Sequence, residues 1–463
     1  MNFIVIIADT LRRDHLGCYG NEWIHTPHID RLASRAMVFD RAYAASFPTG
    51  PHRKDLHTGR FSFTYSPWSA LDPKEVTLAA CLSRAGYVTM LLGDTPALHA
   101  GYANGFTGYE ILRGQATDPW HTDKVDFRLA ADIRKLRGPR SRVAHYFQNT
   151  NRWRTEQDTF VATAMRRAVE WLEYNYQHEK FFLCVDVFDP HEPWLAPRWY
   201  VERYDPGYRG QEVFSPAYRT AGFMTEAELR HMRALYAAEV TLVDRWIGHL
   251  LETVEQMGLF DNTVVCVTTD HGFYHGDHGL VGKVDLRGDY TRWPLYEEMV
   301  HIPMVLRAPA IRPGRCSAFV QPPDIMPTIL DMAGIPVPKT VQGKSLRPLM
   351  EGKARAHRPW ALSSWTLVQD KDVRPPSTLT IRHLAEDWTF IHGGDEAEHA
   401  LYHLPSDPGQ KKNLFARRRA VAERVHAQYL RILKSLGVSD EGIALRADLD
   451  APRRRARGIH RSL

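Results

Sequence analysis

Short apolar runs alternate along this chain with longer segments whose apolar residues recur at helical spacing. The short runs predict buried strands, because β-branched residues dominate them and turn residues bound them. The longer segments predict helices between those strands. This alternation is typical of an α/β fold in which helices flank a sheet. The predicted strands are Asn2–Ala8, 88–92, Phe181–Val187, Thr263–Thr268 and 301–306, and the predicted helices are 76–85, 155–176 and 225–257.

The pattern changes after Gly352. Three strand-like runs follow without helices between them, at 361–365, 378–381 and 389–391, and an amphipathic helix is predicted at 420–436. We therefore expect three parts. They are a catalytic α/β domain over 1–355, a small α+β domain of antiparallel strands with a closing helix over 356–440, and a basic tail over 441–463. Residues 187–224 are predicted to form a long ordered loop of the first domain.

Composition narrows the class of protein. The chain has 463 residues, of which 24% are charged and 44% hydrophobic. These values exclude a disordered chain, a collagen-like repeat and a small disulfide scaffold. The net charge of +5 equals the contribution of five arginines in the last twelve residues, which contain no acid. Because no aromatic residues accompany these arginines, we expect no nucleic-acid partner, and the tail is a candidate contact between copies of the chain.

The five cysteines are odd in number and widely spaced, which predicts neither a disulfide framework nor a zinc site. No apolar stretch approaches the roughly 18–20 residues that a membrane span needs. The apolar N-terminal segment becomes acidic too early for a signal peptide. These features predict a cytoplasmic protein without a membrane partner.

Polar residues with metal-binding chemistry follow two of the predicted strands. Asp9 and Thr10 come after the first strand, and Asp270 and His271 come after the strand Thr263–Thr268. Ligands of open α/β sheets gather at the carboxyl ends of strands. Two carboxylates and an imidazole there predict one divalent metal ion, with the nitrogen favouring Mn or Zn over Ca or Mg. Taken alone, Asp9 has the alternative of capping a helix.

Longer motifs, in the same order along almost the whole chain, resemble the sulfatase family of the alkaline phosphatase superfamily. That family's signature is Cys-x-Pro-x-Arg followed by Thr-Gly-Arg, and the corresponding segment here is TGPHRKDLHTGR at 49–60. The resemblance implies a large mixed, mostly parallel sheet flanked by helices, with a smaller C-terminal domain. The other matching segments are ADTLRRDHLGCYG at 8–20, TPHIDRLA at 26–33, FDPHEPW at 188–194, TTDHGFYHGDHGLVGK at 268–283, DIMPTILDMAGI at 324–335, GKSLRPLM at 343–350 and LYHLPSDPGQKKNL at 401–414.

The resemblance also implies roles for particular residues. Thr49 occupies the position of the nucleophile, and Arg53 that of the arginine supporting the nucleophile and the anionic group. His191 matches a histidine that contacts substrate oxygens or the leaving group, and Lys283 matches a lysine that neutralises the transferred group. Each has a plainer alternative: Arg53 paired with Asp55 at the surface, His191 capping its turn, and Lys283 solvated. The implied metal ligands are Asp9, Thr10, Thr49, Asp270 and His271.

Two positions depart from the family pattern. Threonine cannot be oxidised to the formylglycine that the family makes from Cys or Ser, so we expect no formylglycine at Thr49. Ser46 lies nearby but is out of register with the rest of the motif. Sulfatases usually carry Gly-Lys-Trp after the second strand, where this chain has Gly93-Asp94-Thr95. We expect Asp94 to make the substrate pocket less cationic.

These observations predict a metal-dependent hydrolase of sulfate or related phosphate and phosphonate esters, with Thr49 as metal-activated nucleophile and a small anionic ester as substrate. One alternative is a phosphodiesterase or phosphonate monoester hydrolase rather than a sulfatase. A second, from another class, is a catalytically inactive, sulfatase-like anion-binding protein. Trp194, Tyr200 and Tyr204 in the long loop either line an aromatic pocket or pack in the protein interior.

Overall fold

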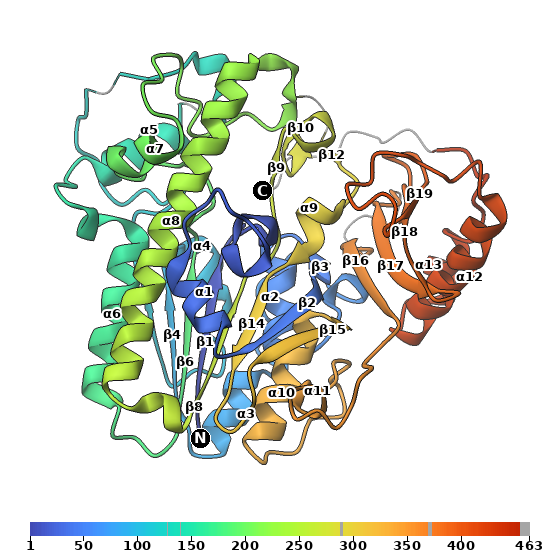
Figure 1. The fold of residues 1–463 in the computed structure, drawn as a ribbon, viewed down its shortest axis with the longest axis horizontal. Helices are drawn as coiled ribbons and strands as arrows, with labels where there is room; N and C mark the ends of the chain where they lie inside the picture. The colour runs from blue at the N-terminus through green and yellow to red at the C-terminus, as the bar shows by residue number, and fades with distance from the viewer. Residues whose placement is uncertain (127, 139, 288–289, 369–372, 454–463) are drawn as a thin grey trace.

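A large mixed sheet forms the centre of the molecule (Figure 1). The computed structural model describes residues 1–463 except 127, 139, 288–289, 369–372 and 454–463. Among the described residues the sheet has nine strands, in the order β13-β2-β14-β8-β1-β6-β4-β5, with β15 also paired to β2. Their bounds are β1 (Asn2–Ala8), β2 (Met37–Tyr43), β4 (Val88–Gly93), β5 (Gly108–Ile111), β6 (Phe181–Val187), β8 (Thr263–Thr268), β13 (His301–Ile302), β14 (Met304–Arg307) and β15 (Gly314–Val320).

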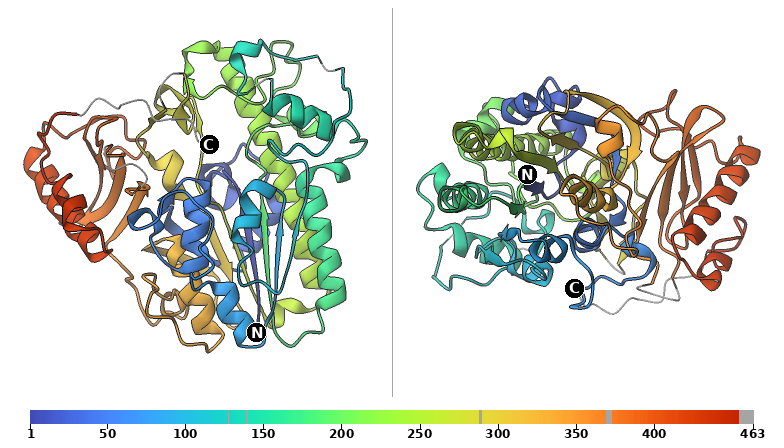
Figure 2. Two further views of the ribbon diagram at one scale, coloured as in Figure 1. Left: turned by 180° about the vertical axis from the view of Figure 1, so that it is seen from behind. Right: turned by 90° about the horizontal axis from the view of Figure 1, so that it is seen from below.

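The five strands β5, β4, β6, β1 and β8 run parallel, and β14 runs antiparallel to both β8 and β2. Helices cover both faces (Figures 1 and 2). On one face α6 (Phe160–Asn175) packs on α8 (Glu226–Gln256), and on the other lie α2 (Thr49–Thr58), α3 (Leu78–Arg84) and α10 (Ile325–Met332). Every residue of β1, β6 and β8 is therefore buried, which explains their continuous apolar sequences.

A second sheet has the order β19-β18-β17-β16-β3. Its C-terminal strands are antiparallel and are covered by α12 (Arg419–Ser435), through Val425, Tyr429 and Leu433 among others. The short strand β3 (Ser46–Phe47), which leads directly into Thr49, pairs with β16 and so ties this sheet to the start of α2. The remaining bounds are β16 (Trp360–Trp365), β17 (Ser377–His383), β18 (Glu386–His392) and β19 (Ala400–His403).

The structure differs from the expected domain boundaries at the C-terminus. The predicted basic tail begins at 441, but α13 (Asp440–Ala444) and the residues after it pack on the small domain, where Arg446 and Leu449 are buried. Burial of these side chains makes 441–449 part of the folded domain. Of the five tail arginines, Arg454, Arg455, Arg457 and Arg461 lie outside the described residues.

Two further differences concern local structure. The run at 301–306 is interrupted at Pro303, so that β13 and β14 are separate strands. The segment 187–224 contains the helix α7 (Arg198–Tyr204) and the short strand β7 (Arg219–Thr220). In the described part of the chain we find no helix with both the length and the apolar character needed to cross a membrane.

Candidate active site

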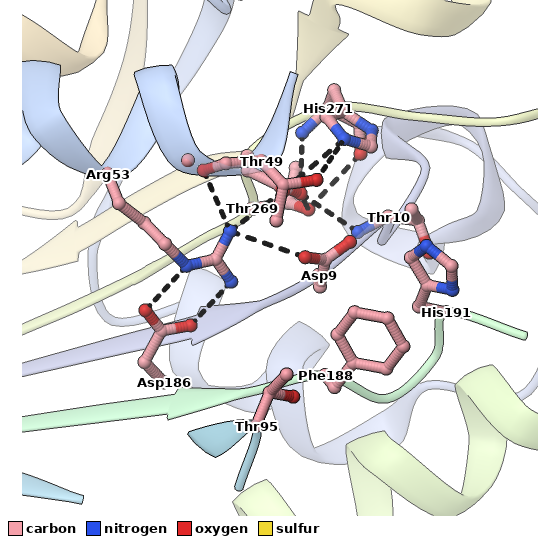
Figure 3. A network of polar contacts seen from close by, with 12 residues as sticks. Asp9, Thr10, Thr49, Arg53, Thr95, Asp186, Phe188, His191, Thr269 and His271 are labelled. Carbon is pink, nitrogen blue, oxygen red and sulfur yellow. Dashed lines mark hydrogen bonds and ion pairs between the residues drawn. The ribbon is translucent and has the colours of Figure 1, made fainter. Parts of the chain in front are cut away.

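The ends of β1 and β8 meet the first turn of α2 at one buried point (Figure 3). Asp9 follows β1, and Asp270 and His271 follow β8, its parallel neighbour in the sheet. One ligand atom from each of these three residues lies within 4.8 Å of the others, and all three side chains are fully buried. The three strand-end residues predicted as metal ligands are thus brought together.

The polar atoms of this cluster are incompletely paired. Neither carboxylate oxygen of Asp9 has a hydrogen-bond partner, and the buried hydroxyl of Thr10 has none either. Asp9 therefore does not cap a helix. Burial, and then the nearby Asp270, raise the pKa of Asp9 well above its usual value. An unpaired buried carboxylate is costly, and carboxylate, hydroxyl and imidazole donors together suit a divalent cation. The donor set fits a metal ion.

Asp270 is held in place by the backbone around it. Its Oδ1 accepts hydrogen bonds from the backbone N–H of Thr10 at 3.0 Å and from that of His271 at 2.8 Å. Thr10 has φ near +60°, a conformation that is strained for a β-branched residue. Strain of this kind persists only where the surroundings fix it, and here the Tyr236 hydroxyl donates to the Thr10 carbonyl at 2.7 Å.

Thr49 and Lys283 converge on the same imidazole nitrogen. His271 Nδ1 lies 2.8 Å from the Gly272 carbonyl and donates to it, so Nε2 carries the lone pair. Thr49 Oγ1 and Lys283 Nζ each lie 3.2 Å from His271 Nε2. Burial lowers the pKa of Lys283, although Asp9 and Asp270 act in the opposite direction. Because only 6% of Lys283 is exposed, the solvated alternative is wrong.

Arg53 is engaged by protein groups on every side. It binds Asp186 at the end of β6 through two hydrogen bonds, from Nε at 2.8 Å and from Nη2 at 2.7 Å. Its Nη1 donates to the Thr49 carbonyl at 3.1 Å and to Asp270 Oδ2 at 2.9 Å. The guanidinium is fully buried, and Asp55 is not its partner. Arg53 thus holds the backbone of the predicted nucleophile.

Asp55 has a different function in the fold. Its carboxylate accepts hydrogen bonds from the backbone N–H groups of Ser46 and Ser62, both at 2.7 Å, and from the Ser46 hydroxyl at 2.8 Å. Ser46 is thereby committed to structure, which agrees with its being out of register with the nucleophile motif.

Two residues of this network were missed from the sequence. Asp186 is an acidic residue inside an otherwise apolar buried strand, and that position was a usable signal, because a buried carboxylate needs a partner. His99 lies in α4 (Pro96–His99), and its Nε2 is 3.3 Å from Asp186 Oδ1. Its Nδ1 accepts from the backbone N–H groups of Asp94 and Thr95, so the ring proton is on Nε2, facing Asp186. No sequence motif marks His99.

His191 faces the cluster from the loop that follows β6 (Figure 3). Its Nδ1 donates to the backbone carbonyl of Glu192 at 2.8 Å, and its ring stacks on Phe188 with centroids 4.0 Å apart. Burial lowers the pKa of His191 to about 3. The ring therefore does cap its own turn through Nδ1, and this leaves Nε2 available to a ligand.

Asp94 is turned toward the protein backbone. Its two carboxylate oxygens lie 3.0 and 3.1 Å from the backbone nitrogen of Phe188 and accept its hydrogen. Burial, followed by Asp189, raises the pKa of Asp94 well above its usual value. Asp94 closes the end of β6, and its contacts do not include the groups of the metal cluster.

The loop aromatics pack in the protein. Trp194 is 1% exposed, and its indole donates to the Pro190 carbonyl at 2.8 Å. The Tyr200 hydroxyl donates to Glu156, and the Tyr204 hydroxyl contacts Thr241. The packing alternative is therefore the correct one for Trp194.

Comparison with known proteins identifies the family. A family model described as Sulfatase matches residues 1–335, which is most of the chain. The chain belongs to the sulfatase family. A second model, N-sulphoglucosamine sulphohydrolase, C-terminal, matches residues 287–435. The predicted membership, and with it the prediction of an enzyme, are confirmed.

Individual members of the family align over nearly the whole length. The N-acetylglucosamine-6-O-sulfatase of Bacteroides thetaiotaomicron is 27% identical and covers 90% of this chain and 83% of the relative. An arylsulfatase of Clostridium perfringens is 24% identical over 95% of each chain. Among solved structures, the phosphonate monoester hydrolase of Agrobacterium radiobacter superimposes with a TM-score of 0.72, at 21% identity, over 94% of this chain and 95% of that one. The predicted fold, a large mixed sheet with a smaller C-terminal sheet, is confirmed.

Proposed function

We propose that this sulfatase-family enzyme is a metal-dependent hydrolase of small anionic sulfate, phosphate or phosphonate esters, with Thr49 as its nucleophile. The observation that supports this most directly is the position of the Thr49 hydroxyl, which lies 3.2 Å from His271 Nε2 beside the unpaired oxygens of Asp9. A hydroxyl next to a vacant set of metal donors is the arrangement required for an activated oxygen nucleophile.

The metal would be held by Asp9, Asp270 and His271, with the hydroxyls of Thr10 and Thr49 as further donors. Bound there, a divalent ion lowers the pKa of the Thr49 hydroxyl and neutralises the anionic ester. The imidazole donor favours Mn or Zn over Ca or Mg.

The protein groups around Thr49 support attack by its oxygen. Arg53 fixes the Thr49 backbone, and the ten-residue helix α2 begins at Thr49, so the positive end of its dipole faces the developing charge. Lys283 Nζ lies on the same side of His271 and would bind a non-bridging oxygen of the ester. His191 presents Nε2 to the oxygen of the leaving group.

The nucleophile favours esters of phosphorus over sulfate. A phosphorylated threonine is released by attack of water, whereas a sulfated threonine lacks the hemiacetal route by which formylglycine expels sulfate. The structural similarity to a phosphonate monoester hydrolase supports this choice, and the sulfatases among the relatives support sulfate. The inactive, anion-binding alternative is less favoured, because a binding protein has no need for unpaired carboxylate oxygens at Asp9.

A panel of esters tests the proposal. Metal-loaded protein is assayed on an aryl sulfate, a phosphate monoester, a phosphate diester and a phosphonate monoester. We expect Thr49→Ala to abolish hydrolysis, while Thr64→Ala, which removes an equally buried hydroxyl outside the site, retains it. A covalent adduct on the peptide containing Thr49, trapped by acid quenching, identifies the nucleophile.

Two results would contradict the proposal. Full activity of Thr49→Ala overturns the nucleophile assignment. Hydrolysis of none of the esters by protein shown to contain metal supports the anion-binding alternative. A cytoplasmic location and assembly through the basic tail are also proposals; the five unpaired cysteines support the former.

A further inference from the structure

Glu192, directly after His191, is a fully buried carboxylate beside the proposed site. Its Oε1 accepts hydrogen bonds from Arg137 Nη1 at 2.8 Å and from the Tyr218 hydroxyl at 2.7 Å. Its Oε2 lies 2.9 Å from His191 Nδ1 and has no partner in hydrogen-bonding geometry. One oxygen is thus anchored, and the other is held against the imidazole.

The carboxylate is ionised in this environment. Burial raises the pKa of Glu192, but His191, and after it Arg137 and Arg142, outweigh burial and hold the pKa well below its usual value. Arg142 contributes through the backbone as well, because its Nη2 donates to the Glu192 carbonyl at 2.8 Å. A buried negative charge with one free oxygen is costly unless a positive charge appears next to it.

We propose that Glu192 is a positioning residue that stabilises His191 as an imidazolium, so that His191 Nε2 protonates the leaving oxygen of the ester. The inference rests on the proposed function and deepens it, because it assigns a source of the proton. It also predicts substrate preference, since an enzyme with a working acid cleaves esters of weakly acidic alcohols as well as activated aryl esters.

The proton balance closes over one turnover. In the first step the Thr49 alkoxide forms a bond to sulfur or phosphorus, and the bond to the ester oxygen breaks with its electron pair staying on that oxygen. This oxygen takes the proton from His191 Nε2 and leaves as an alcohol. In the second step water attacks the Thr49 ester and gives a proton to Nε2, which restores the imidazolium. The Thr49 oxygen departs as the alkoxide.

Orientation and charge come from different atoms of Glu192. The backbone carbonyl accepts from Nδ1 and so fixes the ring orientation, while the side chain supplies the negative charge. Glu192→Gln therefore removes the charge without removing the group that orients the ring. This separation makes a purely structural role distinguishable from an electrostatic one.

The test measures kcat and KM for a series of aryl and alkyl esters whose leaving groups span a wide range of acidity. We expect Glu192→Gln to lower kcat about tenfold or more for the poorest leaving groups, leaving the best ones and KM almost unchanged. Glu239→Gln is the matched control. Glu239 is a buried glutamate of α8 that accepts from the backbone of Leu195 and Ala196 in the same loop, and no contact joins it to His191.

The outcomes separate the two proposals. If folded Glu192→Gln shows the wild-type dependence on the leaving group, the inference about Glu192 is overturned while the hydrolase proposal stands. If the wild type cleaves no ester, the proposed function fails. Should Glu192→Gln not fold, Glu192→Asp carries the test: the shorter chain withdraws Oε2 from the ring, and an unchanged leaving-group dependence again overturns the inference.

Discussion

The guanidinium of Arg53 and the carboxylate of Asp186 form a fully buried, two-point ion pair behind the proposed nucleophile. Burial raises the pKa of Asp186, but Arg53 and His99 outweigh it and hold the pKa below its usual value. Asp186 therefore remains ionised and fixes two edges of the guanidinium. The third nitrogen, Nη1, is left to join Thr49 to Asp270.

Asp186→Asn is expected to lower the free energy of unfolding by about 3–5 kcal/mol, because it leaves part of a buried cation unpaired. Urea denaturation measures this change. The control is Asp132→Asn, which breaks an ion pair to Arg134, whose side chain is 83% exposed. That variant is expected to lose less than about 1 kcal/mol. Equal losses in the two variants would contradict a special role for the buried pair.

Gly93→Ala tests the contact between His99 and Asp186. A Cβ at Gly93 would lie 2.3 Å from His99 Nδ1, so the ring must move away from Asp186. We expect a loss of about 1–3 kcal/mol in stability and weaker metal binding, measured by urea denaturation and calorimetric titration with Mn²⁺. Gly222→Ala, where a Cβ meets open space, is the control and is expected to match the wild type.

The sequence was sufficient for the central strands and the metal cluster. β1, β6 and β8 have the predicted bounds because helices cover both faces of the sheet and force continuous apolar runs. Asp9, Asp270 and His271 were predictable because parallel neighbours end at the same edge of a sheet.

The second layer around these residues was not predictable. His99 meets Asp186 only because a turn after β4 places it beside β6, and no local pattern encodes a contact between residues 87 positions apart. The same holds for β3, whose pairing with β16 depends on how the small domain docks. The length of the C-terminal domain was missed because burial of Arg446 involves tertiary contacts that a charged, irregular sequence does not reveal.

Asp9→Asn separates the cost of the metal site from its use. The substitution removes a buried charge that lacks a hydrogen-bond partner, so the metal-free variant is expected to be at least as stable as the metal-free wild type. Metal at about 100 times its dissociation constant should stabilise the wild type by about 2.7 kcal/mol and the variant much less. Thermal unfolding with and without Mn²⁺ or Zn²⁺ measures both effects.

Chelation provides the matching control for that variant. Treatment of the wild type with a chelator followed by dialysis should abolish hydrolysis and lower Tm to the metal-free value, and added metal should restore both. A wild-type Tm that responds to neither chelator nor metal would contradict the assignment of Asp9, Asp270 and His271 as a metal site.

His57 makes the protein sensitive to acid. It is buried between Tyr102 and Phe106 with both ring nitrogens unpartnered, and burial lowers its pKa to about 4. An unfolded histidine titrates near pH 6.5, so between about pH 6.5 and 4 the unfolded chain binds the extra proton and stability falls as the pH falls. His57→Phe keeps a ring in this aromatic site and removes the titration.

The stability of His57→Phe should therefore depend less steeply on pH than that of the wild type. The difference should grow to about 3 kcal/mol near pH 4, the linkage equivalent of the pKa difference. Urea denaturation at pH values from 4 to 8 measures it. His178→Gln, which replaces an exposed histidine of the loop before β6, is the control and is expected to follow the wild-type curve. Parallel curves for His57→Phe and the wild type would show that another group carries the acid sensitivity.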